Sequence, residues 1–268
     1  MTTDRWVEVG DGVLVRRHAE LDLSTGLVVG ERSALVVDTR GDPEQGSALA
    51  EAVREVTALP WAVVLTHAHF DHCLGTAAFL PTPVWAHPAC RDDLARGGAA
   101  QHAEAVAHGS TRPVPVRPVV PDRVVADRAE LDLGRRRVLL LHPGAGHTDA
   151  DLVVVAGDVL FAGDLVEQGA PPAFDDAFPL QWPATVTALL ALGATTVVPG
   201  HGEPVDTAFV EAQRDALAAL AALCRDCDSA AEVVARSPFD EVTTLTALAR
   251  ATRRAAGSVL PTRQRGRL

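Results

Sequence analysis

The sequence predicts an α+β fold, a four-layer sandwich in which two β-sheets pack together and helices cover their outer faces. Three observations predict it. Short apolar, strand-like segments recur in both halves of the 268-residue chain. Helix-like segments separate them, and the chain reads as helical from Thr207 onward. We therefore expect residues 1–205 to form the main domain and residues 206–268 to form a short helical extension packed on it.

The first half of the chain supplies the first predicted sheet. Its strands are expected at residues 6–9, 13–15, 27–29, 34–37, 61–66 and 83–86. Asp11-Gly12 is typical of a hairpin turn. Residues 43–59 are expected to be a helix, because Asp42 can cap it and Pro43 suits its first position. Residues 75–80 also have helix-like composition.

The second half supplies the second predicted sheet. Its strands are expected at residues 123–133, 137–141, 152–155, 159–162 and 195–198. Helices are expected at residues 88–109, with a break at Gly97-Gly98, and at residues 179–192. Residues 111–121 hold four prolines and are expected to be a connecting loop. Beyond Thr207, one apolar stripe predicts a helix packed on the core; it consists of Val210, Leu217, Leu220 and Leu223.

Composition excludes several functional classes. A net charge of -11 argues against broad nucleic-acid binding, which needs a basic surface. The sequence holds no apolar run long enough to predict a membrane span, and its first residues lack a signal-peptide pattern. We therefore expect a cytoplasmic protein that binds neither membranes nor nucleic acid. The chain contains no Lys, Asn or Tyr, so an active site that requires one of these is excluded.

The most informative segment is the run His67-Ala68-His69-Phe70-Asp71-His72, which places four candidate metal ligands within six residues. Histidine nitrogens and carboxylate oxygens are favoured ligands of zinc and similar divalent ions. Four such ligands so close in sequence cannot all reach one ion from a regular strand or helix. From a loop they can bind two adjacent ions, so the run predicts a dinuclear metal site.

Three further motifs follow predicted strands. They are Gly144-Ala145-Gly146-His147-Thr148, Phe161-Ala162-Gly163-Asp164 and Val198-Pro199-Gly200-His201-Gly202. Each places a ligand-type residue just past a strand end, in a glycine-containing loop. Loops at strand ends are where a rigid scaffold presents reactive groups.

The ordered set of these four motifs resembles the metallo-beta-lactamase-fold hydrolases. The resemblance covers roughly the first 205 residues and implies the metallo-beta-lactamase fold for residues 1–205 as the catalytic domain. It implies that His67, His69 and His147 bind one metal, that Asp71, His72 and His201 bind a second, and that Asp164 bridges them. Two divalent ions are implied as cofactors, zinc above all, with iron or manganese as alternatives.

The resemblance also implies an activity, that of a metallo-hydrolase. Two metals that share a water lower its pKa from the bulk value toward about 7, and the resulting metal-bridging hydroxide attacks a polarised carbonyl or phosphoryl group. Asp71 is the candidate catalytic residue, because it can orient that hydroxide. Asp38 and Thr148 are candidates for holding the ligands in place. The expected partner is a small-molecule substrate such as an ester, a thioester or a lactone-like compound.

Departures from known subfamilies narrow the choice. Metallo-beta-lactamases with a cysteine ligand would carry Cys where Asp164 stands. Lactonases of this fold rely on an active-site Tyr, and glyoxalase II uses Tyr, Lys and Asn types for glutathione; all three types are absent. Residues 169–178, with Phe174 and Phe178, are a candidate for the substrate rim, and so is His87. His102 and His108 are expected at the surface.

Two other functional classes stay open. A mononuclear iron dioxygenase acting on persulfides has the same fold and would use only the site formed by His67, His69 and His147. A metal-binding regulatory protein would keep the ligands without turnover. The C-terminal helices are candidates for a cover over the site or for a homodimer contact. Cys224 and Cys227 form a C-x-x-C pair, a weak redox or zinc signal that we interpret as ordinary reduced thiols.

Overall fold

The computed structural model describes residues 4–109, 116–227 and 229–257 of the chain. Within them, seven strands form a first sheet in sequence order: β1 (Trp6–Gly10), β2 (Val13–Arg17), β3 (Ser24–Val29), β4 (Ala34–Val37), β5 (Trp61–Val64), β6 (Val84–Ala86) and β7 (Arg123–Val124). The first four strands pair antiparallel, whereas β4 to β7 pair parallel. This sheet confirms the strands expected in the first half.

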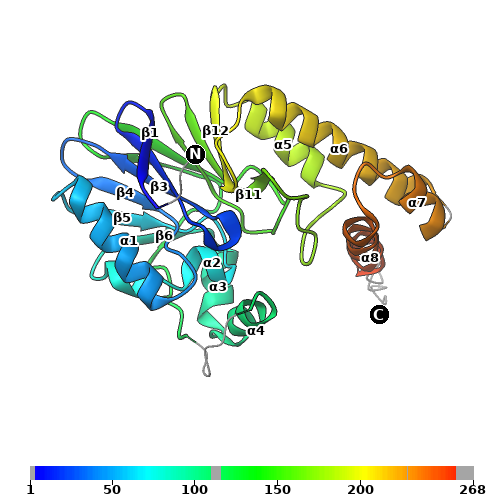
Figure 1. Cartoon of the computed structure of the whole chain (residues 1–268), viewed down its shortest axis with the longest axis horizontal. Helices are drawn as coiled ribbons and strands as arrows, with labels where there is room; N and C mark the ends of the chain where they lie inside the picture. Colours follow the sequence, from blue (N-terminus) through cyan, green and yellow to red (C-terminus); the bar gives the residue numbers. More distant parts are fainter. Residues whose placement is uncertain (1–3, 110–115, 228, 258–268) are drawn as a thin grey trace, which may run out of the picture.

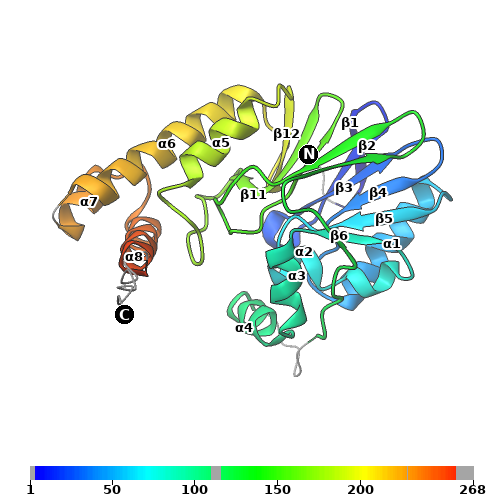
Figure 2. The same cartoon turned by 180° about the vertical axis from the view of Figure 1, so that it is seen from behind.

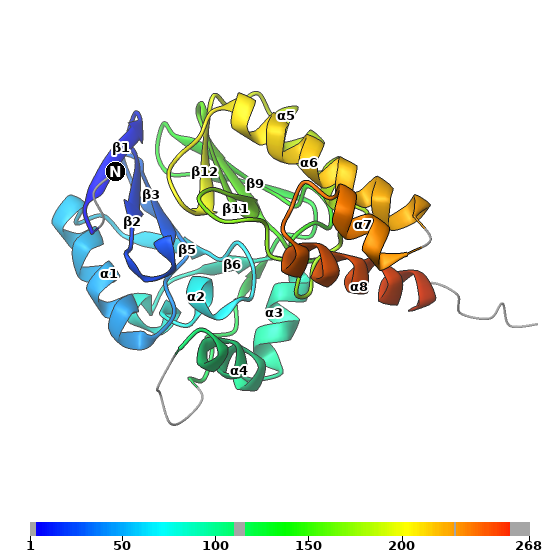
Figure 3. The same ribbon diagram turned by 45° about the vertical axis from the view of Figure 1, so that its right-hand side comes forward.

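The second sheet has five strands in the order β12-β11-β10-β9-β8. They are β8 (Arg128–Asp132), β9 (Arg137–Leu141), β10 (Val153–Ala156), β11 (Val159–Glu167) and β12 (Thr196–His201). Only β11 and β12 pair parallel, so their carboxyl ends lie at the same edge. Figure 3 shows the two sheets facing each other.

Helices complete the four layers. They are α1 (Pro43–Val56), α2 (Phe70–Cys73), α3 (Pro88–Ala95), α4 (Ala99–Ala107), α5 (Trp182–Leu190), α6 (Thr207–Asp226), α7 (Ala230–Arg236) and α8 (Glu241–Gly257). Helix α1 covers the outer face of the first sheet, and α5 and α6 cover the second (Figure 1). Short 3-10 turns occur at Glu20–Asp22 and Thr76–Phe79. The predicted four-layer α+β sandwich is therefore confirmed.

Three apolar clusters lie between these layers. The middle cluster joins Val15 and Val37 of the first sheet to Leu140 and Phe161 of the second. A second cluster packs α1 against the first sheet, and a third packs α5, α6, α7 and α8 against the second. Alternate residues of β2 are buried, as the period of a strand with one covered face requires.

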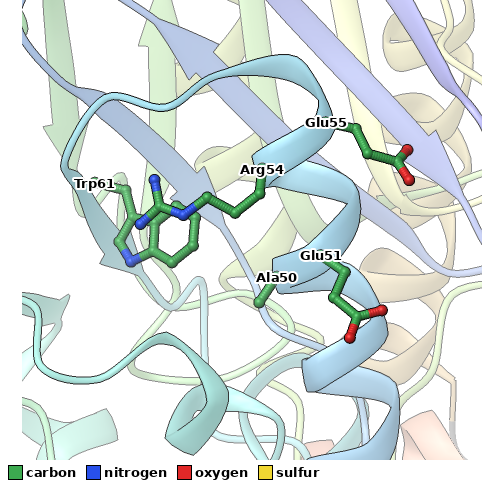
Figure 4. Close-up of a pocket in the computed structure, with 5 residues that line it drawn as sticks. All are labelled: Ala50, Glu51, Arg54, Glu55 and Trp61. Carbon is green, nitrogen blue, oxygen red and sulfur yellow. The ribbon is translucent and has the colours of Figure 1, made fainter.

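Local signals explain where α1 begins. Asp42 has an extended backbone, and its side chain accepts a hydrogen bond from the Gln45 amide at 2.7 Å, with Pro43 in the first turn. On the outer side of this helix the Arg54 guanidinium lies 3.4 Å from the centroid of the Trp61 ring (Figure 4). The hollow beside that pair is lined by Ala50, Glu51, Arg54, Glu55 and Trp61 and contains none of the predicted ligands.

Several predicted boundaries are wrong. The expected strand at residues 123–133 is divided into β7 and β8, which belong to different sheets. The strand expected at residues 159–162 continues to Glu167, and the one expected at 195–198 continues to His201. Residues 110–115 of the proline-rich segment lie outside the described residues. No helix in the described ranges is both long enough and apolar enough to cross a bilayer.

Candidate metal centre

The predicted ligand run begins as an extended segment after β5 and then becomes helical. His69 has an extended backbone and precedes α2, whose first turn contains Asp71 and His72. The expectation that all four ligands lie in one loop is therefore wrong for Asp71 and His72. Because of this helical turn, the side chains of Asp71 and His72 point toward a different group of ligand atoms from those of His67 and His69.

Three histidines converge at one point. The His69 Nδ1 atom lies 3.0 Å from His67 Nε2 and 2.9 Å from His147 Nε2. With a carboxylate oxygen of Asp164, these ring nitrogens lie within 4.8 Å of one another. His67 and His147 are buried, and His69 is partly exposed. The structure thus brings together the four residues predicted around the first metal.

A second group lies beside the first. It consists of Asp71, His72 and His201, whose candidate ligand atoms again lie within 4.8 Å of one another. Asp71 Oδ2 is 3.4 Å from His201 Nε2 and 3.7 Å from His72 Nε2. This set matches the residues predicted around the second metal.

Asp164 lies between the two groups. Its Oδ1 is 3.1 Å from His72 Nε2, on the second group. Its Oδ2 is 3.5 Å from His147 Nε2 and 3.4 Å from His201 Nε2. The carboxylate therefore faces nitrogens of both groups, which is the position that a bridging ligand needs.

The chemistry of these donors fits divalent metal ions. His69 Nδ1 carries either one proton or one lone pair in the plane of its ring, so it can form a good hydrogen bond with only one of the two nitrogens that face it. A single cation can instead bind the lone pairs of all three rings. Buried His72 Nε2 and Asp164 Oδ1 make no hydrogen bond with acceptable geometry, although they lie close together. Buried polar atoms are normally paired, and a metal would satisfy both.

Glycine makes the position of Asp164 possible. A Cβ atom on Gly200 would lie 1.8 Å from Asp164 Oδ1, far inside contact distance. Gly163 has a positive φ of 53°, which a side chain rarely adopts. The two glycines of these motifs let parallel strands β11 and β12 present Asp164 and His201 at one edge.

Asp38 supports the ligand run from the end of β4. Its Oδ2 lies 2.8 Å from His72 Nδ1 and accepts a hydrogen bond from the Thr66 hydroxyl at 2.8 Å. Its Oδ1 accepts from the Thr66 amide, also at 2.8 Å. The Thr66 hydroxyl is in turn 3.0 Å from His67 Nδ1. This geometry is what the candidate role of Asp38 requires, because it fixes which ring nitrogen of His72 faces the site.

Thr148 does not hold His147, contrary to expectation. Its hydroxyl donates to Asp151 Oδ1 at 2.7 Å, and its amide donates to Asp151 Oδ2 at 2.8 Å. His147 Nδ1 is buried without a hydrogen-bond partner among the described residues. Thr148 and Asp151 instead shape the turn that follows His147.

Two acidic residues that the sequence did not indicate contact His69. Asp176 Oδ2 lies 3.3 Å from His69 Nε2, and Glu104 Oε1 lies 3.8 Å from His69 Nδ1. Glu104 Oε2 also accepts a hydrogen bond from the Phe70 amide. Asp176 lies in the loop between β11 and α5, and Glu104 lies in α4. Both are far from the ligand run in sequence, so no local motif predicts their contact with His69.

The site mixes neutral and protonated histidines around an ionised carboxylate. Burial lowers the pKa of His67 well below its usual value and that of His147 to about 4. Burial also opposes protonation of His69 and His201, but nearby carboxylates raise both pKa values to about 10. Burial disfavours the charged form of Asp164, yet its histidine neighbours hold its pKa well below normal. A metal binding here must therefore displace protons.

A cavity of about 1030 Å³ opens over both groups. Residues 169–178 contribute to its wall through Ala170, Pro171, Ala173, Asp175 and Asp176. Phe174, expected at the rim, is instead buried and packs edge-on against Trp182. The segment thus lines the cavity, as expected for a rim, but the prediction is wrong for Phe174 and Phe178, neither of which lines it.

The remaining histidines lie outside both ligand groups. His87 stacks on His142 with ring centroids 4.4 Å apart and is not part of the cavity wall, so its predicted place at the rim is wrong. His108 is exposed, as expected, but it also lines the cavity beside Phe70. His102 is half-buried rather than exposed.

Comparison with known proteins agrees with the fold of this chain. The model of the metallo-beta-lactamase superfamily matches residues 20–201. A metallo-beta-lactamase from Pontibacter korlensis is 21% identical, with a TM-score of 0.65, over 80% of this chain and 98% of that one. The DIM-1 metallo-beta-lactamase is 19% identical, with a TM-score of 0.62, over 80% and 96%. No curated protein matches significantly. At these identities the two structures show the fold alone.

Proposed function

The chain belongs to the metallo-beta-lactamase superfamily, and we propose that it is a metal-dependent hydrolase of small molecules, acting on an ester, a thioester or a lactone-like bond. One observation carries the proposal. Two groups of ligand atoms meet at Asp164 beneath a cavity large enough for a drug-sized molecule. A site that only stored or sensed a metal would not need that cavity.

We infer that His67, His69 and His147 hold one ion, that Asp71, His72 and His201 hold the other, and that Asp164 contacts both. When bound, divalent ions at such a pair lower the pKa of water and polarise the substrate oxygen. Asp71 lines the cavity and is placed to accept a hydrogen bond from the attacking water and so to orient it. Asp176 and Asp38 hold the rings of His69 and His72 against rotation.

The ligand set favours zinc. Five histidines and two aspartates, without a cysteine, form a borderline donor set that zinc binds well and that iron and manganese also accept. The second group, complete in Asp71, His72 and His201, favours a dinuclear hydrolase over the mononuclear iron dioxygenase. A dioxygenase would need only the first group.

Metal content is the first test. Metal analysis of the purified chain is expected to give about two zinc ions per chain, as a two-metal site requires. A panel of esters, thioesters, lactones and phosphodiesters should then reveal hydrolysis that chelation abolishes and zinc restores. One iron per chain with oxygen consumption on persulfides would overturn the proposal in favour of the dioxygenase. Metal without turnover on the whole panel would favour a regulatory protein.

A further inference from the structure

The wall of the cavity is strongly acidic, a feature that metal binding by itself does not require. Beyond the proposed ligands, six carboxylate side chains line it: Asp93, Glu104, Asp149, Glu167, Asp175 and Asp176. Among the described residues, Arg96 is the only arginine that lines it, and Arg96 is already paired with Asp93. Negative side chains therefore lie on the wall formed by α3 and α4, on the segment at residues 169–178 and in the turn after His147.

Bound metals would not neutralise this wall. Two divalent ions carry four positive charges, of which the ligands Asp71 and Asp164 cancel two. Arg96 adds one, which leaves three positive charges against six wall carboxylates. Burial raises the pKa values of both Glu167 and Glu104, and four carboxylates still exceed three if both are neutral. Charge of one sign in a cleft with low-dielectric walls selects ligands of the opposite charge.

A second, independent observation concerns Gln101. This residue lines the cavity and is only 6% exposed. Its Nε2 donates a hydrogen bond to the Ala68 carbonyl at 3.3 Å, which fixes the orientation of the amide. Among the residues that the structure describes, its Oε1 is left buried without a partner. A buried acceptor that lacks a donor is unusual in a native protein, and a ligand N–H group would satisfy it.

We propose that this cavity takes substrates carrying a protonated amine, held by Gln101 and by the acidic wall while the scissile bond lies over the two ligand groups. The inference rests on the proposed hydrolase function and adds the substrate class. Among the described residues that line the cavity, the one arginine, Arg96, is paired with Asp93, so no arginine is free to bind a carboxylate or phosphate. We therefore expect anionic substrates to bind more weakly than cationic ones.

Binding and turnover can be tested separately on the full, metal-loaded chain. Calorimetry would compare three stable phenyl ethers: 2-(dimethylamino)ethyl phenyl ether, its neutral isostere 3-methylbutyl phenyl ether, and 3-phenoxypropionate. We expect the amine to bind at least about tenfold more tightly than the isostere, and the carboxylate to bind most weakly. The preference should shrink at high salt, because screening shortens electrostatic reach. Equal binding of all three ethers, no binding, or a preference for the carboxylate overturns the proposal.

Matched variants locate the effect. Asp175→Asn and Gln101→Met should each reduce the preference for the amine several-fold. Asp158→Asn removes the same charge in the turn just before β11, roughly 20 Å from Asp164 along the chain, and should leave the preference unchanged. An equal effect of Asp158→Asn would reduce the inference to overall net charge and so overturn it. Because Asp175 contributes only an exposed side chain, its variant remains informative if Gln101→Met fails to fold.

Turnover is measured on the matching benzoate esters of dimethylaminoethanol and 3-methylbutanol. A higher kcat/KM for the amine ester supports both the hydrolase and its substrate class. If neither ester is hydrolysed but the amine ether still binds selectively, the hydrolase proposal fails for esters while the cavity preference stands. If both esters are hydrolysed with equal kcat/KM, the hydrolase proposal stands and the proposed preference for amines is overturned.

Discussion

At the scale of single residues, Asp71 and His72 belong to a different ligand group from His67 and His69. The two pairs are close in sequence, but α2 begins between them and turns the later pair away. His72 is fully buried, and its Nε2 faces Asp164 Oδ1 at 3.1 Å. Its Nδ1 atom lies within hydrogen-bond distance of Asp38, so Nε2 is the ring nitrogen left to bind a metal in the second group.

Replacing His72 by alanine should therefore remove one metal and not both. We expect His72→Ala to retain about one metal per chain where the parent holds about two. Metal analysis after dialysis measures this directly. His108→Ala, which removes a histidine outside both groups, is the matched control and should keep the full content. Retention of both metals by His72→Ala would show that the second group is assigned wrongly.

His18 predicts a pH dependence of stability. This residue is buried, and burial, helped by Arg40 and Arg16, lowers its pKa from 6.5 to about 3. Between these values the unfolded chain binds a proton that the folded chain does not, so stability falls as the pH falls below about 6.5. The loss from this group should reach roughly 2 kcal/mol by about pH 5.

Urea denaturation at about pH 7.5 and pH 5 measures this loss. His18→Gln keeps a polar side chain next to Thr25, whose hydroxyl is 3.0 Å from His18 Nε2, but removes the titration. We expect the variant to lose less stability than the parent on acidification. Parallel losses in both proteins would show that other groups dominate the acid side.

At the scale of elements, the segment between β11 and α5 joins the metal site to the C-terminal helices. Arg250 of α8 donates hydrogen bonds to the backbone carbonyls of Asp176 and Ala177. Asp176 in turn contacts His69. Figure 2 shows α8 on the side of the molecule where this segment leaves β11. Helix α8 is thus positioned to hold a wall of the cavity.

Loss of this link should weaken metal binding without removing a ligand. We expect Arg250→Gln to lower metal affinity at the first group by less than the about 10–100-fold typical of losing a ligand's own hydrogen-bond partner. A chelator competition assay measures the affinity. Arg253→Gln removes the same charge from an exposed position on the same helix. Identical affinities for both variants would mean that α8 does not position Asp176.

At the scale of the whole molecule, the C-terminal helices share their core with the second sheet. Leu217 of α6, Val233 of α7 and Ala247 of α8 belong to the apolar cluster that includes Val166 and Trp182. The division into residues 1–205 and an extension at 206–268 stays a prediction about the chain. The shared cluster indicates that the extension and the second sheet unfold together.

Two leucine truncations in the extension test this. Leu217→Ala removes a side chain that is 1% exposed, and should lower the unfolding free energy of the whole chain by about 2–5 kcal/mol. Leu245→Ala makes the same change where the side chain is 39% exposed, and should cost close to the about 0.5 kcal/mol of a surface substitution. Thermal unfolding followed by two probes measures both. A separate early transition in Leu217→Ala would show that the extension folds independently.

The predictable part of the fold rests on short-range signals. Alternation and apolar runs indicated most strands, and Asp42 with Pro43 marked the start of α1, because burial and capping act over a few residues. Strand ends were less predictable. The extension of β11 through Asp164 to Glu167 depends on its parallel pairing with β12, which begins 29 positions after β11 ends. No local signal at residues 163–167 shows that partner.

The sequence by itself indicated the seven candidate ligands and their division between two ions, because the ordered set of short motifs resembles that of one family. Only the tertiary structure decided how the two groups meet, since Gly200 leaves the space in which Asp164 lies between them. It also decided the cavity wall. Glu104, Asp176 and Gln101 come from separate elements and acquire their environment only when those elements pack around the ligands.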